Sequence, residues 1–173
     1  MRQLIQRHGR KFAAATAVSA ALAVGTALPA HAAPTVYRIT TVATLAVDVA
    51  GSSSDSGAAV IQWPINNGQN QEWTLVGKSY GSWLVNYRTG KCLSVSGAST
   101  SAGAPLVQYP CGDVAHEEWA LEPVNSGTAY VLRNANSHQV IDVPGGTGNW
   151  GTQLEQWPSN GNPNQYFWFQ SVA

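Results

Sequence analysis

Short runs of three to five mostly apolar, β-branched or aromatic residues recur along the chain from residue 36 to residue 169. Gly, Pro, Ser and Asn separate these runs, and no window in this part of the chain carries a sustained helical period. Short β-rich runs at this spacing predict an all-β barrel or sandwich. The twelve expected strands are 36–40, 45–49, 59–63, 71–75, 83–86, 91–95, 105–109, 118–121, 130–133, 139–143, 153–157 and 167–169.

One pattern of residues occurs three times with the same internal spacing. Asp48, Ser94 and Asp142 are each followed by Gln after 14 residues, by an aromatic after 15, and by a Gln/Glu-x-aromatic triplet after 23. The repeats cover about 36–80, 81–126 and 127–173. A single unit of ~45 residues cannot bury its own apolar face, so the three units must share one core. Closure around a threefold axis would also remove exposed strand edges.

The first 32 residues have a different character. A basic start with Arg2 and Lys11 precedes the apolar, Ala-rich stretch 12–28, and Ala30-His31-Ala32 forms an A-x-A site. This layout predicts a secretory signal peptide over 1–32, export from the cell, and one mature domain over 33–173. The alternative is a membrane anchor, but the apolar run is short for a span of about 20 residues. We therefore expect no membrane attachment after cleavage.

Loss of the leader would change the charge of the protein. Four of the nine Lys and Arg residues would leave and all nine Asp and Glu residues would stay, which gives a net charge of −4. Five scattered basic residues cannot form a stripe along a phosphate backbone, so we expect no nucleic-acid partner. A compact domain of this size needs no metal to fold, and we expect a monomer without metal or cofactor.

Two cysteines, Cys92 and Cys111, remain in the mature chain. In an exported chain the simplest interpretation is one disulfide. Closing a loop of about 20 residues would stabilise the fold by roughly 3 kcal/mol in the chain-entropy model. Free thiols are the alternative, although no His/Cys set for a metal or a nucleophile accompanies them.

The three Gln-x-Trp-like triplets, each with an upstream Leu-Asp-Val-like strand, resemble the ricin-type β-trefoil lectins and the related family 13-type carbohydrate-binding modules. The resemblance covers residues 36–173 and implies a β-trefoil of three four-stranded repeats with pseudo-threefold symmetry. It also places the two cysteines in the disulfide frame that the family has within one repeat. In this family the triplet is mainly architectural, so Trp73, Trp119 and Phe167 are expected in the core.

A sugar site needs an exposed aromatic plate for the apolar face of a pyranose, and a carboxylate and an amide for its hydroxyls. By resemblance these roles, with a Gln bracing each acid, fall on Asp48, Trp63, Asn70 and Gln71 in the first repeat, and on Asp142, Trp157, Asn164 and Gln165 in the third. Singly, each could be an ordinary turn or loop residue. Two complete sets at matched spacing favour a binding role.

The second repeat departs from this pattern. Ser94 replaces the acid and His116 the Asn, while Tyr109 keeps an aromatic plate. Glu117 replaces the Gln of the triplet. We therefore expect a structural role for this repeat, and whether it binds a ligand stays open.

Two further positions concern the third site. The residue two positions before the plate, a Gln in many relatives, is Ile61 in the first repeat, Val107 in the second and Glu155 in the third. Glu155 makes the third site the more polar and joins the expected binding residues. Trp150, in the adjacent Gly-rich loop 145–151, either walls a second subsite or packs against its own turn.

The resemblance implies a secreted, non-catalytic lectin that binds galactose- or xylose-type sugars or polysaccharides through shallow sites in repeats 1 and 3. One alternative is a small secreted glycosidase in which Asp142 and Glu155 form the carboxylate pair. Against it, Ile61 occupies the position of Glu155 in the first repeat, and neither His116 nor His138 has a Ser or Cys partner at motif spacing. A protein-binding β-trefoil is the other alternative. The identity of the sugar stays open.

Overall fold

The computed structural model describes residues 33–172 of the chain. The signal peptide expected over residues 1–32 lies outside the described residues and stays a prediction. Regular structure within 33–172 consists of β-strands and short 3-10 helices of three residues each, as the predicted all-β class requires. Across this range no helix has the length and apolar character needed to cross a membrane.

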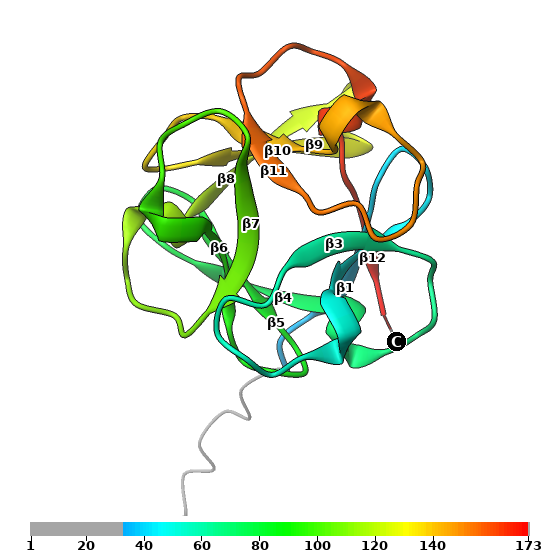
Figure 1. Cartoon of the computed structure of the whole chain (residues 1–173), viewed down its shortest axis with the longest axis vertical. Helices are drawn as coiled ribbons and strands as arrows, with labels where there is room; N and C mark the ends of the chain where they lie inside the picture. Colours follow the sequence, from blue (N-terminus) through cyan, green and yellow to red (C-terminus); the bar gives the residue numbers. More distant parts are fainter. Residues whose placement is uncertain (1–32, 173) are drawn as a thin grey trace, which may run out of the picture. The chain divides into compact units, whose positions relative to one another are not determined.

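Six strands, two from each repeat, form a closed barrel (Figure 1). They are β1 (Val36–Thr40), β4 (Glu72–Gly77), β5 (Ser82–Asn86), β8 (Trp119–Val124), β9 (Ala129–Asn134) and β12 (Trp168–Ser171). Neighbours pair antiparallel in the order β12, β1, β4, β5, β8, β9. A bridge between Tyr130 and Phe167 joins β9 to the residue before β12. The ring of six strands is therefore closed, which leaves no free edge within the barrel itself.

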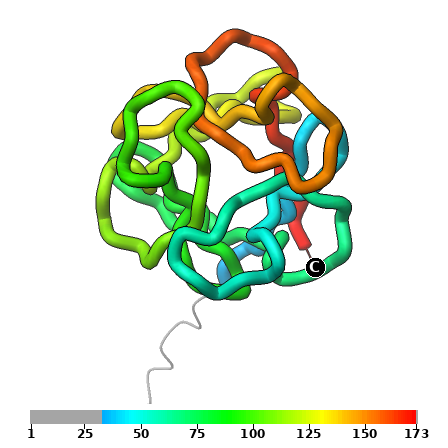
Figure 2. Tube along the Cα trace, in the orientation of Figure 1, coloured from blue at the N-terminus to red at the C-terminus, as the bar shows by residue number. Residues whose placement is uncertain are grey.

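The other six strands form one hairpin per repeat. The hairpins are β2 (Ala46–Val49) with β3 (Val60–Trp63), β6 (Cys92–Val95) with β7 (Ala104–Tyr109), and β10 (Val140–Asp142) with β11 (Glu155–Trp157). Bridges between the hairpins join Ala59 to Val107, Pro105 to Glu155, and Ile61 to Gln153. Figures 1 and 2 show three similar lobes around a common centre, so the expected β-trefoil is confirmed.

The shared core contains one aromatic residue from the end of each repeat. Trp73, Trp119 and Phe167 are 0%, 0% and 1% exposed, as expected. The indole N–H of Trp73 donates to the carbonyl of Val47 at 3.0 Å, and that of Trp119 donates to the carbonyl of Leu93 at 3.0 Å. Both buried polar atoms thus have partners, which full burial of an indole requires.

A buried glutamine fastens a loop of the neighbouring repeat to each hairpin. The Nε2 of each of these residues donates to two backbone carbonyls at 2.8–3.0 Å. The sets are Gln62 with Thr147 and Asn149, Gln108 with Ser53 and Asp55, and Gln156 with Ser99 and Ser101. An amide nitrogen offers two N–H donors, and both are used here. This contact explains why Gln recurs at the period of the repeat.

The disulfide between Cys92 and Cys111 is present and joins β6 to the loop after β7. The two cysteines are 19 positions apart in the sequence, within the second repeat. The matching positions hold Ala46 and Ile65 in the first repeat and Val140 and Ser159 in the third. The covalent link is therefore a feature of the second repeat only.

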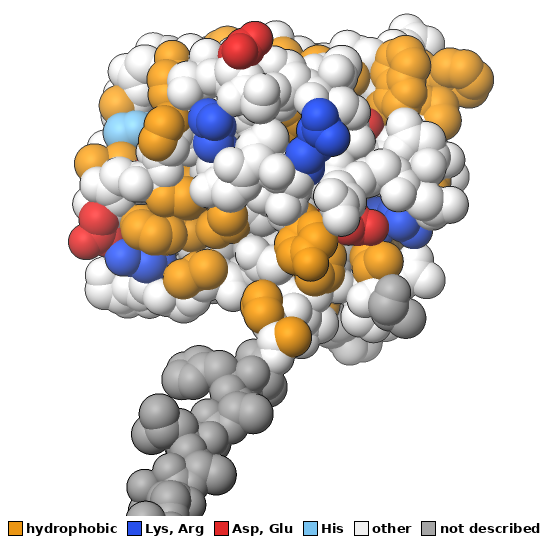
Figure 3. All heavy atoms as spheres, turned by 90° about the horizontal axis from the view of Figure 1, so that it is seen from below, with side chains coloured by type: hydrophobic (Ala, Val, Ile, Leu, Met, Phe, Trp, Pro, Cys, Tyr) orange, Lys and Arg blue, Asp and Glu red, His pale blue; other side chains and the backbone are white. Residues whose placement is uncertain are grey.

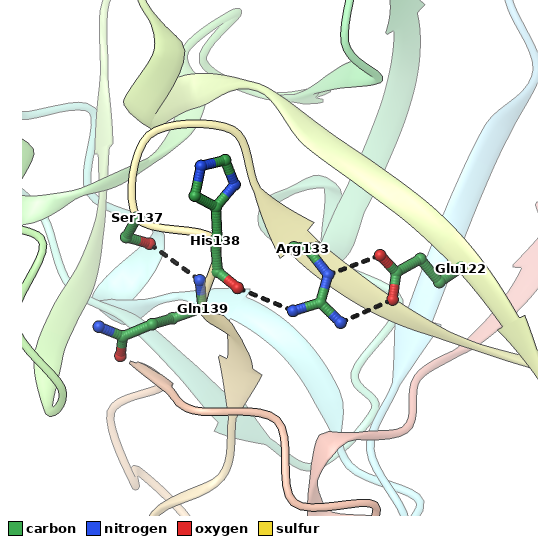
Figure 4. Close-up of polar contacts among 5 residues, drawn as sticks. All are labelled: Glu122, Arg133, Ser137, His138 and Gln139. Carbon is green, nitrogen blue, oxygen red and sulfur yellow. Dashed lines mark hydrogen bonds and ion pairs between the residues drawn. The ribbon is translucent and has the colours of Figure 1, made fainter.

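An ion pair ties two barrel strands and a turn together (Figure 4). Arg133 of β9 donates to both carboxylate oxygens of Glu122 in β8, at 2.6 and 2.8 Å, and to the carbonyl of His138 at 2.7 Å. The hydrogen bonds from Arg133 lower the pKa of Glu122. The charged side chains of β8 and β9 thus pair with each other and hold the turn after β9.

Basic side chains do not gather into a stripe on the face shown in Figure 3, where Lys and Arg lie apart from one another. Some of them lie beside Asp or Glu side chains. This face therefore offers no continuous positive track for a phosphate backbone.

Candidate functional site

Three shallow depressions repeat around the pseudo-threefold axis, one in each repeat. Their volumes are about 270 Å³ in the first repeat, 330 Å³ in the second and 630 Å³ in the third. The first is lined by Asp48, Ile61, Trp63 and Asn70, and the third by Asp142, Glu155, Trp157 and Asn164. Each set of expected residues therefore meets in one depression, although a binding role for them stays a prediction. Gln71 and Gln165 lie behind the lining, fully buried.

In the first repeat a buried carboxylate is held by two amides. Asp48 of β2 is 2% exposed. Asn70 Nδ2 and Gln71 Nε2 both donate to its Oδ2, at 2.9 and 2.8 Å. No described residue donates to the other oxygen, Oδ1. That oxygen is free to accept a hydrogen bond from a ligand hydroxyl.

The third repeat has the same arrangement. Asn164 Nδ2 and Gln165 Nε2 donate to Oδ1 of Asp142, at 2.7 and 2.9 Å. Within residues 33–172 nothing donates to its Oδ2. Two carboxylates thus present one free oxygen each, in equivalent places.

The asparagines have a bracing role that the sequence analysis did not assign to them. Besides the carboxylate, Asn70 Nδ2 donates to the carbonyl of Val49 at 3.3 Å, and Asn164 Nδ2 donates to that of Val143 at 3.1 Å. Both amide hydrogens of each Asn are therefore used inside the protein. Only the amide oxygen remains for a ligand.

Short 3-10 helices bring these amides to the acid. Asn70 and Gln71 lie in η2 (Gln69–Gln71), and the corresponding pair in the third repeat lies in η7 (Pro163–Gln165). Gln71 also donates to the carbonyl of Pro64 at 2.9 Å and accepts from the N–H of Asn66 at 3.0 Å. Every polar group of this buried side chain is satisfied, so it holds the acid and the loop after β3 together.

Each depression has an exposed aromatic plate at the end of a strand. Trp63 is 39% exposed and Trp157 is 42% exposed. A Cβ placed on Gly151 would lie 3.4 Å from Cζ3 of Trp63, and one on Gly103 would lie 3.6 Å from Cζ3 of Trp157. Both glycines have φ near +79°, which an L side chain rarely adopts. The backbone of a neighbouring repeat thus supports one part of each indole, and the rest stays in solvent.

Burial and charge change the acidity of the carboxyl groups. Desolvation raises the pKa of Asp48 and Asp142 above the usual 3.8, and the amide hydrogen bonds partly offset this. Asp142 lies directly opposite Glu155 across the hairpin, whereas Asp48 lies opposite Ile61. The pKa of Glu155 is raised by desolvation and then by the negative charge of Asp142. The third depression is therefore the more acidic of the two.

The second depression is lined by Ser94, Tyr109, His116 and Glu117 and contains no acid at the Asp position. Tyr109 is 41% exposed, like the indoles of the other repeats. The buried Glu117 accepts from the N–H of Gly112 at 2.8 Å. Glu117 thus accepts the same backbone hydrogen bond as the equivalent Gln residues of the other repeats. It has no neighbouring Asp to hold in place.

Parts of neighbouring repeats border the depressions, which the spacing within each repeat does not predict. Val42 of the first repeat lines the third depression. The residue of the second repeat that corresponds to Val42 is Arg88. Its Nε donates to the carbonyl of Ser52, which lines the first depression. Trp150 contacts Trp63 of the first depression, with ring centroids 6.3 Å apart, but it lines neither the first nor the third depression itself. The sequence contained no local signal for these contacts between repeats.

The family description "Ricin-type beta-trefoil lectin domain-like" matches the sequence over residues 26–109, 69–157 and 119–173. No curated protein matches the chain.

Solved structures share the fold. The designed threefold-symmetric protein ThreeFoil has 31% identity and a TM-score of 0.76, over 79% of this chain and 99% of its own. An exo-β-1,3-galactanase from Clostridium thermocellum has 26% identity and a TM-score of 0.77, over 80% of this chain but only 30% of its own. The Macrolepiota procera ricin B-like lectin, solved with lactose, has 22% identity and a TM-score of 0.70, over 82% of this chain and 98% of its own.

Proposed function

Because this chain belongs to the family of ricin-type β-trefoil lectin-like domains, we propose that it is a secreted, non-catalytic lectin. It binds galactose- or xylose-type glycans through the depressions of the first and third repeats. Carbohydrate binding follows from the family. The two sites, the class of sugar and secretion are our own proposals.

The arrangement around the two buried acids carries this proposal. Asp48 and Asp142 each keep one carboxylate oxygen free, while two amides hold the other oxygen in place. An exposed indole stands beside each acid. A sugar that stacks on the indole can donate one or two hydroxyls to the free oxygen in short, charge-assisted bonds.

The printed names of the similar structures suggest which glycans to test first. One is an exo-β-1,3-galactanase and another is a lectin in complex with lactose. The chain spans only 30% of the galactanase, so the activity of that enzyme is not proposed for this chain. Lactose and β-1,3-galactobiose are therefore reasonable first probes, with xylobiose as the pentose alternative.

Calorimetric titration of these sugars tests the proposal. The wild type is expected to bind two molecules of one of these sugars, Trp63→Ala and Trp157→Ala one each, and the double variant none. Tyr109→Ala is the matched control, because it removes the equivalent plate from the second repeat, and it should leave the stoichiometry unchanged. Undiminished binding by the double variant would show that these indoles are not the plates.

One observation favours a second candidate, a glycosidase. Asp142 and Glu155 face each other in one depression, and the pKa of Glu155 is raised, as a general acid requires. However, Ile61 occupies the position of Glu155 in the first repeat, so the shared design does not need the pair. Release of reducing sugar from oligosaccharides, abolished by Glu155→Gln, would support the enzyme instead.

A further inference from the structure

Two indoles from different repeats lie side by side at the first depression. Trp63 ends β3, and Trp150 comes from the loop after β10 in the third repeat. Their ring centroids are 6.3 Å apart, and their planes are inclined by 60°. Trp150 is 67% exposed, more than any other large apolar side chain of the described domain.

Hydrogen bonds fix the backbone on both sides of Trp150 relative to Trp63. Gln62, directly before Trp63, donates to the carbonyls of Thr147 and Asn149, and its own backbone carbonyl accepts from the N–H of Gly151 at 2.9 Å. The loop on both sides of Trp150 is thus tied to the strand that carries the other indole. The backbone that carries the two indoles is preorganised, so little backbone entropy would be lost when a ligand covers the pair.

The fold itself does not require an aromatic residue at this position. The equivalent loops of the other repeats make the same glutamine contacts, but they carry Ser56 and Ala102 where this one carries Trp150. A large exposed apolar group that the fold does not need is typical of a contact surface. Its place beside the first depression indicates what it contacts.

We propose that Trp150 forms a second sugar subsite next to Trp63, so that the first depression binds at least two adjacent sugar rings of an oligosaccharide. This inference rests on the proposed lectin function. One ring stacks on Trp63 and donates hydroxyls to Asp48, while the next ring stacks on Trp150. The third depression has Ala102 at the equivalent place and binds a single ring.

The inclination of the two indoles restricts the ligand further. Faces that meet at 60° do not form a flat platform. They suit a soluble chain whose successive rings are turned relative to each other, and they disfavour the flat surface of a crystalline polysaccharide. The ligand class is therefore a soluble oligosaccharide or a flexible polysaccharide chain.

Sugars of increasing length test the subsite. The full chain carrying Trp157→Ala is expressed and purified, so that only the first depression binds. Calorimetry then compares galactose, β-1,3-galactobiose and β-1,3-galactotriose, and also xylose, xylobiose and xylotriose. We expect the disaccharide of one series to bind roughly three- to tenfold more tightly than its monosaccharide. Trp150→Ala should remove this gain and leave monosaccharide affinity unchanged.

Controls separate the subsite from other effects. Trp150→Phe keeps an aromatic face and should restore most of the gain with chain length. Tyr80→Ala removes an exposed aromatic that lines none of the three depressions, and it should have no effect. If sugars bind but affinity does not depend on length, or Trp150→Ala keeps the gain, the subsite does not exist. If no sugar of either series binds, the proposed function fails first.

Discussion

Asp48 and Asp142 each accept two amide hydrogen bonds on one oxygen. The residues beside them must therefore be able to donate hydrogen bonds. Gln71 and Gln165 can donate to the acid, but Glu cannot. In the second repeat the acid is Ser94 and the Gln is Glu117. A Glu beside an Asp would place two carboxylates at one buried position. The loss of the acid and the change to Glu are therefore linked by electrostatics.

The ionisation of these acids predicts how binding depends on pH. Because burial raises the pKa of Asp142 above 3.8, this carboxylate becomes protonated at a higher pH than an ordinary Asp. The proton goes to the oxygen that no amide holds, which turns the acceptor for a sugar hydroxyl into a donor. Titration of lactose into Trp63→Ala should therefore show weaker binding at pH 4 than at pH 7. The pKa of Glu155 is raised as well, so its protonation contributes to the same decline.

The variant Asp142→Asn separates this effect from unfolding. Its side-chain oxygen can still accept from both amides, but its NH₂ now faces the sugar. In the Trp63→Ala background it should bind lactose at least about tenfold more weakly at pH 7, since hydrogen bonds to charged groups contribute roughly 1.5–3 kcal/mol.

The pKa of Asp142 also determines how this residue affects folding stability. Because its pKa is higher in the folded state than in the unfolded state, burial of the ionised acid lowers the free energy of unfolding above the folded-state pKa, and this cost disappears below 3.8. Protonation of Asp142 therefore does not itself unfold the protein. A flat pH profile would argue against the carboxylate contact.

At the scale of elements, the sequence predicted all twelve strands, with ends displaced by up to three residues. The alternation of apolar runs and breakers was sufficient because eleven strands contribute apolar residues to a common core, and Leu154 directly before β11 does the same. The 3-10 helices were not predicted. Three residues carry no periodicity, and the contacts that favour η2 and η7 involve Asp48 and Asp142, which lie more than 20 residues earlier.

The contacts between repeats could not be predicted from spacing alone. Equal spacing shows that Gln62, Gln108 and Gln156 play the same part, but not which loop each one holds. For this reason the two alternatives for Trp150 both lay within the third repeat, while the fold places it against Trp63 of the first. The expected residues that line each depression could be predicted within a repeat, and the parts contributed by neighbouring repeats could not.

One of these three glutamines has a side-chain oxygen without a hydrogen-bond partner among the described residues. The side-chain oxygens of Gln108 and Gln156 accept from the hydroxyls of Thr89 and Ser137, at 2.8 and 2.6 Å. The equivalent residue in the first repeat is Ala43, and the buried Oε1 of Gln62 has no hydrogen-bond partner among the described residues. A buried acceptor without a partner reduces stability.

Substitution of Ala43 should supply this missing donor. Ala43→Thr introduces the residue found in the second repeat, and Ala43→Val has nearly the same shape without a hydroxyl. We expect the Thr variant to be more stable than the Val variant by roughly 1 kcal/mol, the usual contribution of one hydrogen bond. Urea unfolding of both variants measures the difference. Equal stabilities would mean that a bound water already satisfies Gln62.

At the scale of the whole molecule, the pseudo-threefold axis sets the two proposed sites on one rigid body. The sites belong to different lobes, so one small sugar cannot occupy both (Figure 1). Each site is shallow and should bind a single sugar weakly. On a surface with many glycans, however, the second contact becomes intramolecular, and avidity can exceed the affinity of one site by roughly 10²–10⁴-fold.

The gain in avidity should therefore require both sites. On a sensor surface with dense lactose, the wild type should dissociate far more slowly than Trp63→Ala or Trp157→Ala, while each variant keeps the soluble-lactose affinity of its remaining site. At low lactose density the three proteins should dissociate at similar rates, because the second site then finds no partner. If a single-site variant keeps slow dissociation at high density, another contact must hold it. Tyr109→Ala in that background would show whether the second repeat supplies this contact, and sedimentation would show whether self-association does.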